Sequence, residues 1–232
     1  PPSEYGFDDS LVAFEGNGNR LGYWNDDGSK YGLSQSNEDA TVGTFQYCYF
    51  YQSPEKQVDA ALTFITNAVT AGKPFYIHVP FTDTHSPYNV APSERHDFDH
   101  ISGNDTANTF LGELHNLDKN FGRLVQTIDS MGLATNTLIV VVGDNGAPND
   151  SINTLLNRNG GLRSGKGNLY EGGIREPFII RWPGTVPAGV VNTNTAVSTL
   201  DLLPTYCSFA KIALPNAPFA GENMSDVFGG SQ

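Results

Sequence analysis

Residues 137–146 read TLIVVVGDNG, a short and nearly continuous apolar run that ends in an aspartate, an asparagine and a glycine. Such a run predicts a β-strand that is buried in a sheet covered on both faces. The run PFYIHVPF at 74–81 has the same character, and PFIIRW at 177–182 predicts a further strand. The chain therefore carries at least three strand candidates, each followed by a polar or glycine-rich loop.

Segments with a helical period alternate with these strands, and they predict helices over 54–72, 109–131 and 198–212. Their apolar stripes are Val58, Ala61, Leu62, Ile65 and Val69 in the first helix, and Leu114, Leu117, Phe121, Leu124, Val125, Ile128 and Met131 in the second. Residues 1–53 have no sustained period and are predicted to form loops with one or two short strands. Alternating helices and strands predict an α/β fold, with a mostly parallel sheet and helices on both of its faces.

The composition excludes several classes of protein. The chain has 13 Lys and Arg against 25 Asp and Glu, a formal net charge of −12, which argues against a nucleic-acid-binding face. Any anionic substrate must therefore be captured by local positive charge. No apolar run reaches the length of a membrane span. The two cysteines, Cys48 and Cys207, lie among apolar residues and are predicted to be buried thiols.

Asp144 and Asn145 lie at the end of the strand predicted within 137–146. In open α/β sheets, functional groups gather just beyond the carboxyl ends of the strands. A carboxylate and an amide oxygen side by side are ligands that a hard cation such as Ca²⁺ prefers, although two ligands are too few alone. The same residues also fit an ordinary turn, because Asn-Gly is a turn signal.

His85 follows the run at 74–81, within the sequence TDTHSPY. A histidine at this place can donate to an anion or protonate a leaving group. It also fits a loop histidine without a chemical task. Both interpretations stay open at this point.

Lys166 lies in the glycine-rich stretch GLRSGKGNLYEGG, residues 161–173. Gly160 to Lys166 reads G-x-x-x-x-G-K, but Gly167 stands where a phosphate-binding P-loop needs Ser or Thr. No strand precedes the stretch, so we exclude a nucleotide site. The glycines predict a backbone that approaches something closely, with the lysine as a point charge. Arg163 either joins it or is a surface charge.

Five segments in order resemble the sulfatase family, within the alkaline-phosphatase-like superfamily. They are GFDDS (6–10), KPFYIHVPFTDTHSPYNVAP (73–92), HNLDKNFGRLVQTIDSMGLATNTLIVVVGDNG (115–146), GLRSGKGNLYEGGIREPFIIRWPG (161–184) and VSTLDLLPTYCSFAKIALP (197–215). The resemblance implies an alkaline-phosphatase/sulfatase-like fold and hydrolysis of sulfate esters. It implies a sulfated small molecule or sulfated glycan as substrate, and a periplasmic, extracellular or lysosomal-type compartment.

The resemblance also implies roles for single residues. Asp144 and Asn145 would be two of the ligands of Ca²⁺. Lys166 would bind the sulfate and stabilise the leaving oxygen, with Arg163 as a further candidate for substrate binding. His85 would contact the sulfate and serve as, or assist, the general acid.

Some family features are missing from the chain. The family nucleophile is a formylglycine made from the Cys or Ser of a C-x-[PA]-x-R motif, and neither Cys48 nor Cys207 fits that motif. We therefore expect residues 1–232 to be a section of the catalytic domain, truncated at both ends, without the nucleophile region and the small C-terminal subdomain. Such a section is expected to be inactive alone and to expose an apolar sheet edge.

Two other interpretations remain open from the sequence. One is a truncated or degenerate sulfatase-like domain that binds a ligand without turnover. The other is a phosphatase or phosphonate monoester hydrolase of the same superfamily, although such enzymes usually hold their metals with more Asp and His ligands than this chain offers.

Overall fold

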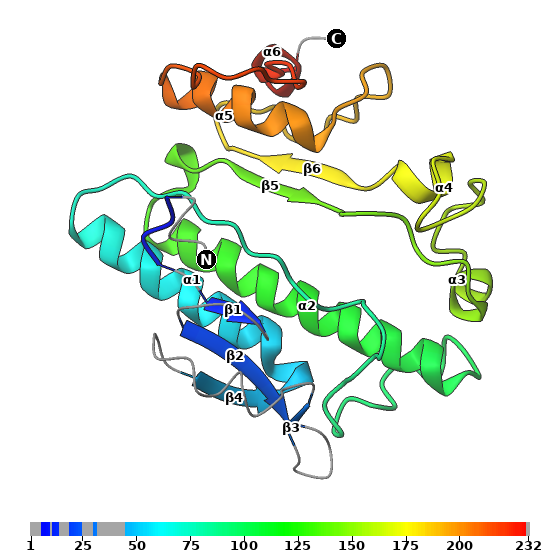
Figure 1. Ribbon diagram of the computed structural model, residues 1–232. Helices are drawn as coiled ribbons and strands as arrows, with labels where there is room; N and C mark the ends of the chain where they lie inside the picture. Colours follow the sequence, from blue (N-terminus) through cyan, green and yellow to red (C-terminus); the bar gives the residue numbers. More distant parts are fainter. Residues whose placement is uncertain (1–5, 10, 14–18, 25–29, 32–44, 231–232) are drawn as a thin grey trace. The chain divides into compact units, whose positions relative to one another are not determined.

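The computed structural model describes residues 6–9, 11–13, 19–24, 30–31 and 45–230, in two compact units, Pro1–Thr127 and Ile128–Gln232. Figure 1 labels the elements along the chain. Those that begin in the first unit are β1 (Leu11–Ala13), β2 (Asn19–Trp24), β3 (Lys30–Tyr31), β4 (Phe45–Tyr49), the 3-10 turn η3 (Phe50–Gln52), α1 (Ser53–Thr70) and α2 (Asp105–Ser130).

The first unit contains a small sheet. β2 pairs with β1 and β4 in parallel and with β3 in antiparallel orientation. The prediction of one or two short strands before residue 53 was wrong, since the described part holds four. Tyr23 on β2 is buried, and its hydroxyl lies 2.9 Å from Ser53 Oγ at the start of α1. Cys48 and Cys207 are both free and buried, which confirms the prediction for the thiols.

α1 confirms the first predicted helix. Pro54 occupies the first turn, where its missing N–H is not needed. Val58, Ala61 and Ile65 of the predicted stripe are buried. Gly72 follows the helix with a φ of 65°, a conformation that glycine adopts without strain.

α2 begins earlier than predicted and buries a different side at its start. The side chain of Asn104 accepts a hydrogen bond from the Ala107 amide at 2.9 Å and so caps the helix. Leu124 and Ile128 are buried as predicted, but Leu114 is 42% exposed, whereas Glu113 is 0% exposed. The predicted apolar stripe was wrong at this end of the helix. The spacing of apolar residues does not reveal a polar residue that is buried because it forms hydrogen bonds.

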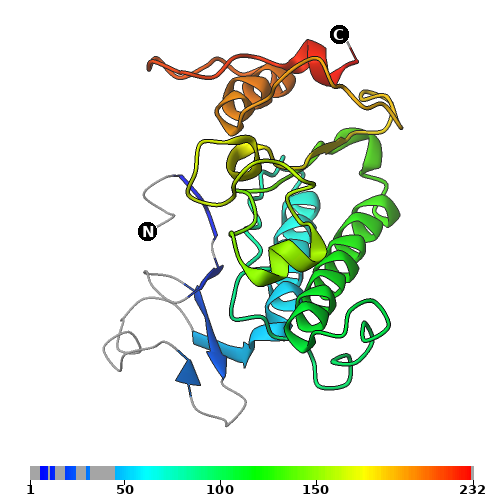
Figure 2. The same cartoon turned by 90° about the vertical axis from the view of Figure 1, so that its right-hand side faces the viewer.

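α1 and α2 lie side by side in both Figure 1 and Figure 2. Arg123 on α2 joins them, since its guanidinium donates to Asp59 Oδ1 at 2.6 Å and to the Glu55 carbonyl at 3.0 Å. Asn116 adds a bond to the Tyr51 carbonyl at 2.6 Å. These contacts fix α2 against the start of α1.

The strand predicted at 74–81 is wrong, because no hydrogen-bonded strand forms there among the described residues. The segment alternates strictly, with Phe75, Ile77, Val79 and Phe81 half-buried and the residues between them exposed. This is the period of an extended chain with one covered face. The prediction that the segment 74–81 is buried on both faces was therefore wrong.

The second unit is built on a pair of strands, which confirms the strands predicted within 137–146 and 177–182. Its elements are η4 (Ala134–Asn136), β5 (Ile139–Val142), α3 (Ser151–Leu156), α4 (Glu171–Ile174), β6 (Phe178–Arg181), η5 (Thr199–Asp201), α5 (Leu202–Ala210) and α6 (Ser225–Phe228). β5 and β6 pair in antiparallel orientation. Val142 and Ile179 remain 38% and 59% exposed, so β5 was wrongly predicted as fully buried.

Side chains beyond the strand pair hold the second unit together. Arg181 on β6 donates to both carboxylate oxygens of Asp129, at 2.8 and 3.0 Å. The ring of Phe209 on α5 lies 5.1 Å from that of Trp182 and 6.2 Å from that of Phe228, measured between centroids. The helix predicted over 198–212 is present as η5 followed by α5. Asp201 lies at the start of α5 and is buried. Its carboxylate accepts hydrogen bonds from the backbone amides of Ser198 and Glu222.

A pair of buried carboxyl groups lies in the first unit. Asp83 is 6% exposed, and both of its carboxylate oxygens are buried without a hydrogen-bond partner among the described residues. Burial raises the pKa of Asp83 to about 7. Burial, and then the charge of Asp83, raise the pKa of Glu113 to about 8. Both groups therefore favour the neutral form in the folded chain.

This pair predicts a pH dependence of stability. The reference pKa values are 3.8 and 4.5, so between these and about 7 to 8 the folded state binds more protons than the unfolded state. The stability contribution is full at low pH and is lost as the pH rises through the folded values. We expect the free energy of unfolding to decrease by about a few kcal/mol between pH 5 and pH 8.5.

Denaturant unfolding across this pH range measures the effect, with Asp83→Asn as the matched comparison. The variant should show a flatter pH dependence, because one of the two raised carboxyls is gone and the other loses its like-charged neighbour. The same pH slope in both proteins would contradict the assignment.

Candidate active site

Asp144 and Asn145 form a bend, the turn after β5, and only Gly143 separates them from the strand. The Asn145 amide donates to Asp144 Oδ1 at 2.9 Å, and the Asn145 side-chain nitrogen donates to the Gly146 carbonyl at 3.1 Å. These bonds fix the orientation of both side chains. Among the described residues, no donor reaches Asp144 Oδ2 or Asn145 Oδ1. The turn prediction and the ligand prediction are therefore compatible, since the turn leaves two oxygens available.

The lysine loop, residues 161–173, lies against this turn. The Gly146 amide donates to the Gly173 carbonyl at 3.0 Å, and the Lys166 amide donates to the Ala147 carbonyl at 3.0 Å. Two segments about twenty residues apart are thus joined by backbone hydrogen bonds. The structure places the backbone of Lys166 beside the turn of Asp144 and Asn145.

The glycines of the lysine loop are explained by close backbone packing. A Cβ on Gly146 would run into the Gly172 carbonyl oxygen, and a Cβ on Gly165 would run into the Ala147 carbonyl oxygen. Gly172 and Gly173 have equally little room, against carbonyl oxygens of the same loop. The close approach predicted from the sequence is therefore an approach of the loop to itself and to the turn after β5.

Lys166 and Arg163 differ in their surroundings. The side chain of Lys166 is exposed, and no acidic group of the described residues pairs with its ammonium. The Arg163 guanidinium stacks over the Tyr170 ring, with Cζ 3.5 Å from the ring centroid. Stacking holds its fork of donors in one plane while leaving its edges accessible. The ammonium of Lys166 thus has no ion-pair partner among the described residues, whereas the guanidinium of Arg163 is oriented by its contact with Tyr170.

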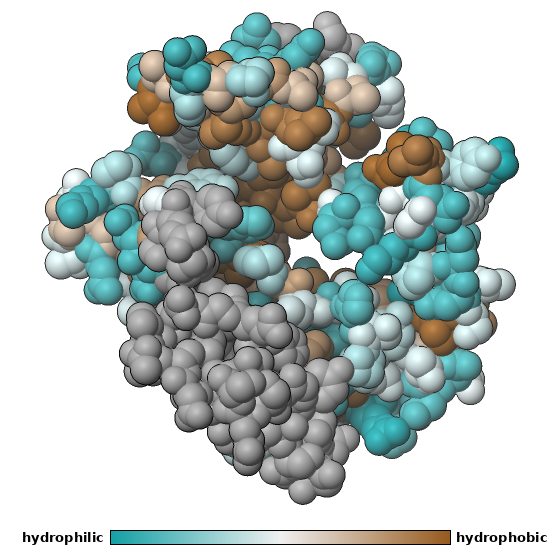
Figure 3. All heavy atoms as spheres, viewed as in Figure 1, coloured by the Kyte–Doolittle hydropathy of each residue, from teal (hydrophilic) through white to brown (hydrophobic). Residues whose placement is uncertain are grey.

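Exposed apolar side chains border the lysine loop. Figure 3 shows hydrophobic residues at the surface over α4, where Leu169, Tyr170 and Ile174 are exposed. The lysine loop therefore presents apolar as well as charged surface.

Glu176 is a residue that the sequence analysis missed. Its carboxylate lies beside Gly143, where an added Cβ would come within 2.6 Å of Glu176 Oε2. Burial raises the pKa of Glu176, and the charge of Asp144 raises it further. Like charges that repel in this way are stabilised when a cation lies near. Only the antiparallel pairing of β5 with β6 brings Glu176 to this place, and no sequence motif announces that pairing.

His85 lies in the first unit, whereas the other predicted site residues lie in the second. Its ring is exposed, and Nδ1 is 2.7 Å from the Ser86 carbonyl oxygen. A carbonyl only accepts, so Nδ1 carries the proton and Nε2 is the nitrogen left for other partners. In the imidazolium form Nε2 can donate a proton, and in the neutral form it can accept one.

The side chains near His85 include the buried carboxyls of Asp83 and Glu113, which the sequence analysis also missed. Asp83 is two residues from His85, within the quoted TDTH, and this short spacing was the available signal. Glu113 gave no such signal, because it precedes the predicted apolar stripe of α2, which begins at Leu114.

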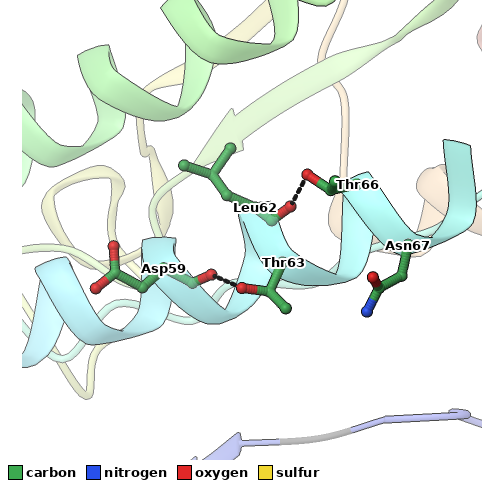
Figure 4. A pocket seen from close by; sticks show the side chains of 5 residues that line it. All are labelled: Asp59, Leu62, Thr63, Thr66 and Asn67. Carbon is green, nitrogen blue, oxygen red and sulfur yellow. Dashed lines mark hydrogen bonds between the residues drawn. The ribbon is translucent and has the colours of Figure 1, made fainter. Parts of the chain in front are cut away.

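A hollow on the surface of α1 is not a second candidate site. Figure 4 shows its lining: Asp59, Leu62, Thr63, Thr66 and Asn67. The hydroxyls of Thr63 and Thr66 donate to helix carbonyls, each at 2.8 Å, and Asp59 pairs with Arg123. These polar groups are already engaged, so the hollow offers little chemistry.

Two features are absent from the part of the chain that the structure describes. No cluster of three or more His, Cys, Asp or Glu side chains there is arranged to hold a metal ion. No helix of that part is long and apolar enough to cross a membrane.

The chain is similar to several known proteins. The chain is 33% identical to Arylsulfatase A of Bos taurus over 180 residues. This aligned region covers 76% of this chain and 33% of that protein. The crystal structure of Ps i-CgsB superposes with a TM-score of 0.71 at 29% identity, over 85% of this chain and 43% of that chain. A structure of Ps i-CgsB in complex with k-i-k-neocarrahexaose gives a TM-score of 0.68.

The chain spans about a third of the length of the curated relatives that it matches. The α/β fold class predicted from the sequence is confirmed by the structural neighbours. The family model for sulfatases matches residues 3–212. By this match and by its arylsulfatase relatives, the chain belongs to the sulfatase family.

Proposed function

We propose that the protein containing this chain hydrolyses sulfate esters, and that the turn after β5 and the lysine loop form part of its active site. The observation that carries the proposal is the hydrogen bond from the Lys166 amide to the Ala147 carbonyl, which ties the lysine to the segment of Asp144 and Asn145. Membership of the sulfatase family supports the reaction class.

Lys166 has the properties required of a sulfate ligand. A sulfate ester is an anion, and negative charge develops on its oxygens as the S–O bond breaks. An unpaired ammonium on a rigid, glycine-packed loop can meet that charge without first breaking an ion pair. Within a chain of net charge −12, this local cation is necessary for capture.

We propose Ca²⁺ as the cofactor, held in part by Asp144 and Asn145. The available oxygens of these side chains fit a hard cation, and the raised pKa of Glu176 marks a spot where extra positive charge is favourable. Two ligands are too few for Ca²⁺ alone, so further oxygen ligands are needed to complete the site. When bound, Ca²⁺ supplies positive charge that offsets the charge of the sulfate.

His85 is proposed to act on the leaving group. With Nδ1–H bonded to the Ser86 carbonyl, the imidazolium form of His85 can donate its Nε2 proton to the departing oxygen. The attacking group is proposed to be a formylglycine outside this chain. The substrate is proposed to be a sulfated small molecule or glycan, and the complex of Ps i-CgsB with k-i-k-neocarrahexaose supports an oligosaccharide.

The role of Lys166 is tested by Lys166→Ala in the full-length protein, with an aryl sulfate as substrate. We expect kcat to fall by about 10²- to 10³-fold, because one preorganised positive group is removed from the developing charge. Lys73→Ala is the matched control, since Lys73 is also exposed and should leave kcat unchanged. Equal rates for Lys166→Ala and the wild type would exclude the lysine from the site.

The role of Asp144 is tested through the cation. Removal of Ca²⁺ by a chelator should abolish activity, and added Ca²⁺ should restore it. In Asp144→Asn the Ca²⁺ concentration needed for half-activation should rise at least about tenfold, because a charged ligand becomes neutral.

Glu222→Gln serves as the control for Asp144→Asn, because Glu222 is exposed and lies in the same unit. Terbium luminescence reports binding independently of turnover. If Asp144→Asn binds the ion as tightly as the wild type, Asp144 is not a ligand.

A further inference from the structure

The His85 loop, residues 82–90, is held from one side by a single buried carboxylate. Glu113 on α2 accepts a hydrogen bond from the Thr84 amide at 2.9 Å and another from the Asn89 amide at 3.4 Å. Thr84 precedes His85 directly, and Asn89 follows it by four residues. One side chain therefore ties both ends of the segment that carries His85.

The first of these bonds holds an unfavourable backbone conformation. Thr84 has a φ of 69°, in the left-handed region. A β-branched residue there is a true outlier, and such a conformation persists only where the surroundings enforce it. The bond from the Thr84 amide to Glu113 is the enforcing contact that the structure shows, directly next to His85.

The rest of the loop packs on the same stretch of α2. Val90 leaves no space beside Gly112, where an added Cβ would lie 2.8 Å from Val90 Cγ2. The Tyr88 ring meets Phe110 edge-on, at 5.3 Å between centroids. These contacts seat the far end of the loop, but they do not reach His85 itself.

A carboxylate at position 113 is costly for the fold. Its side chain is fully buried, and the charge of Asp83 acts on it as well, so its pKa is raised. Among the described residues, Asp83 is the one charged group that acts on the carboxyl of Glu113. An apolar residue would suit this inward face of α2 better for packing alone. The hydrogen bonds to the loop are what a carboxylate adds.

We propose that Glu113 is a positioning residue for His85, holding the loop backbone so that the imidazole presents Nε2 to the substrate. This inference rests on the proposed function, in which His85 protonates the leaving group. Glu113 acts only through the backbone of residues 84 and 89. It contacts neither substrate nor cofactor.

Glu113→Gln in the full-length protein tests the proposal. The glutamine keeps the size and one acceptor oxygen, but its NH₂ group cannot accept the second amide. We expect kcat to fall about 10-fold or more, with KM changed little, because one of the two buried hydrogen bonds that hold the loop backbone is lost. The loss should be larger for an alkyl or sugar sulfate, whose leaving oxygen needs a proton, than for an electron-poor aryl sulfate.

Two comparisons separate positioning from a general structural role. In a His85→Ala background, Glu113→Gln should have no further effect on kcat, since both changes remove the same contribution. Asp118→Asn, an exposed carboxylate on the same helix, should leave all rates unchanged. Additive losses, or equal losses for good and poor leaving groups, would overturn the proposal.

Hydrogen exchange gives a readout that does not depend on sulfatase activity. The amides of Thr84 and Asn89 should exchange faster in Glu113→Gln, while amides in the middle of α1 keep their rates. If the two amides exchange faster in the variant but the wild type hydrolyses no sulfate ester, the proposed function is wrong. The support of the loop backbone by Glu113 is then still confirmed. Unchanged exchange rates at both amides would show that Glu113 does not hold the loop backbone.

Discussion

The candidate site in the second unit depends on the contact between the turn after β5 and the lysine loop. Two backbone hydrogen bonds make this contact, from Gly146 to Gly173 and from Lys166 to Ala147. They are possible only because glycines at the crossing leave no Cβ between the two backbones. A side chain at Gly146 or Gly172 would push Lys166 away from Asp144 and Asn145. The glycine-rich sequence is thus the condition for placing positive charge beside the oxygen ligands.

Several parts of this arrangement follow from the sequence, because they depend on local patterns. α1 and the second half of α2 follow their apolar periods, and Gly72 and Gly132, both with positive φ, mark where these helices stop. The apolar runs that became β5 and β6 were also recognisable. The segment 74–81 shows the limit of such patterns. Its residues suit an extended chain, but a strand also needs a hydrogen-bonding partner, and a local pattern does not specify one.

Glu113 in the first unit and Glu176 in the second could not be predicted in the same way. Glu113 lies outside the predicted apolar stripe of α2, which begins at Leu114, and its bonds to Thr84 and Asn89 explain its burial. Glu176 reaches Gly143 through the pairing of two strands that are 35 or more residues apart. By contrast, Lys166, Asp144 and Asn145 could be proposed from the sequence because they belong to contiguous motifs. Contiguous motifs are visible in one sequence, whereas contacts between distant residues are not.

The nucleophile is the part of the proposed reaction that these residues do not contain, so it offers the most direct test of the central claim. That claim is that Lys166, Asp144 and Asn145 belong to a working sulfatase site. The decisive measurement is the intact mass of the source protein, with sequencing of any chain upstream of Pro1. We predict a longer chain that carries C-x-[PA]-x-R, with a formylglycine in place of its first residue. A protein that begins near Pro1, or one whose upstream chain lacks such a motif, would contradict the claim.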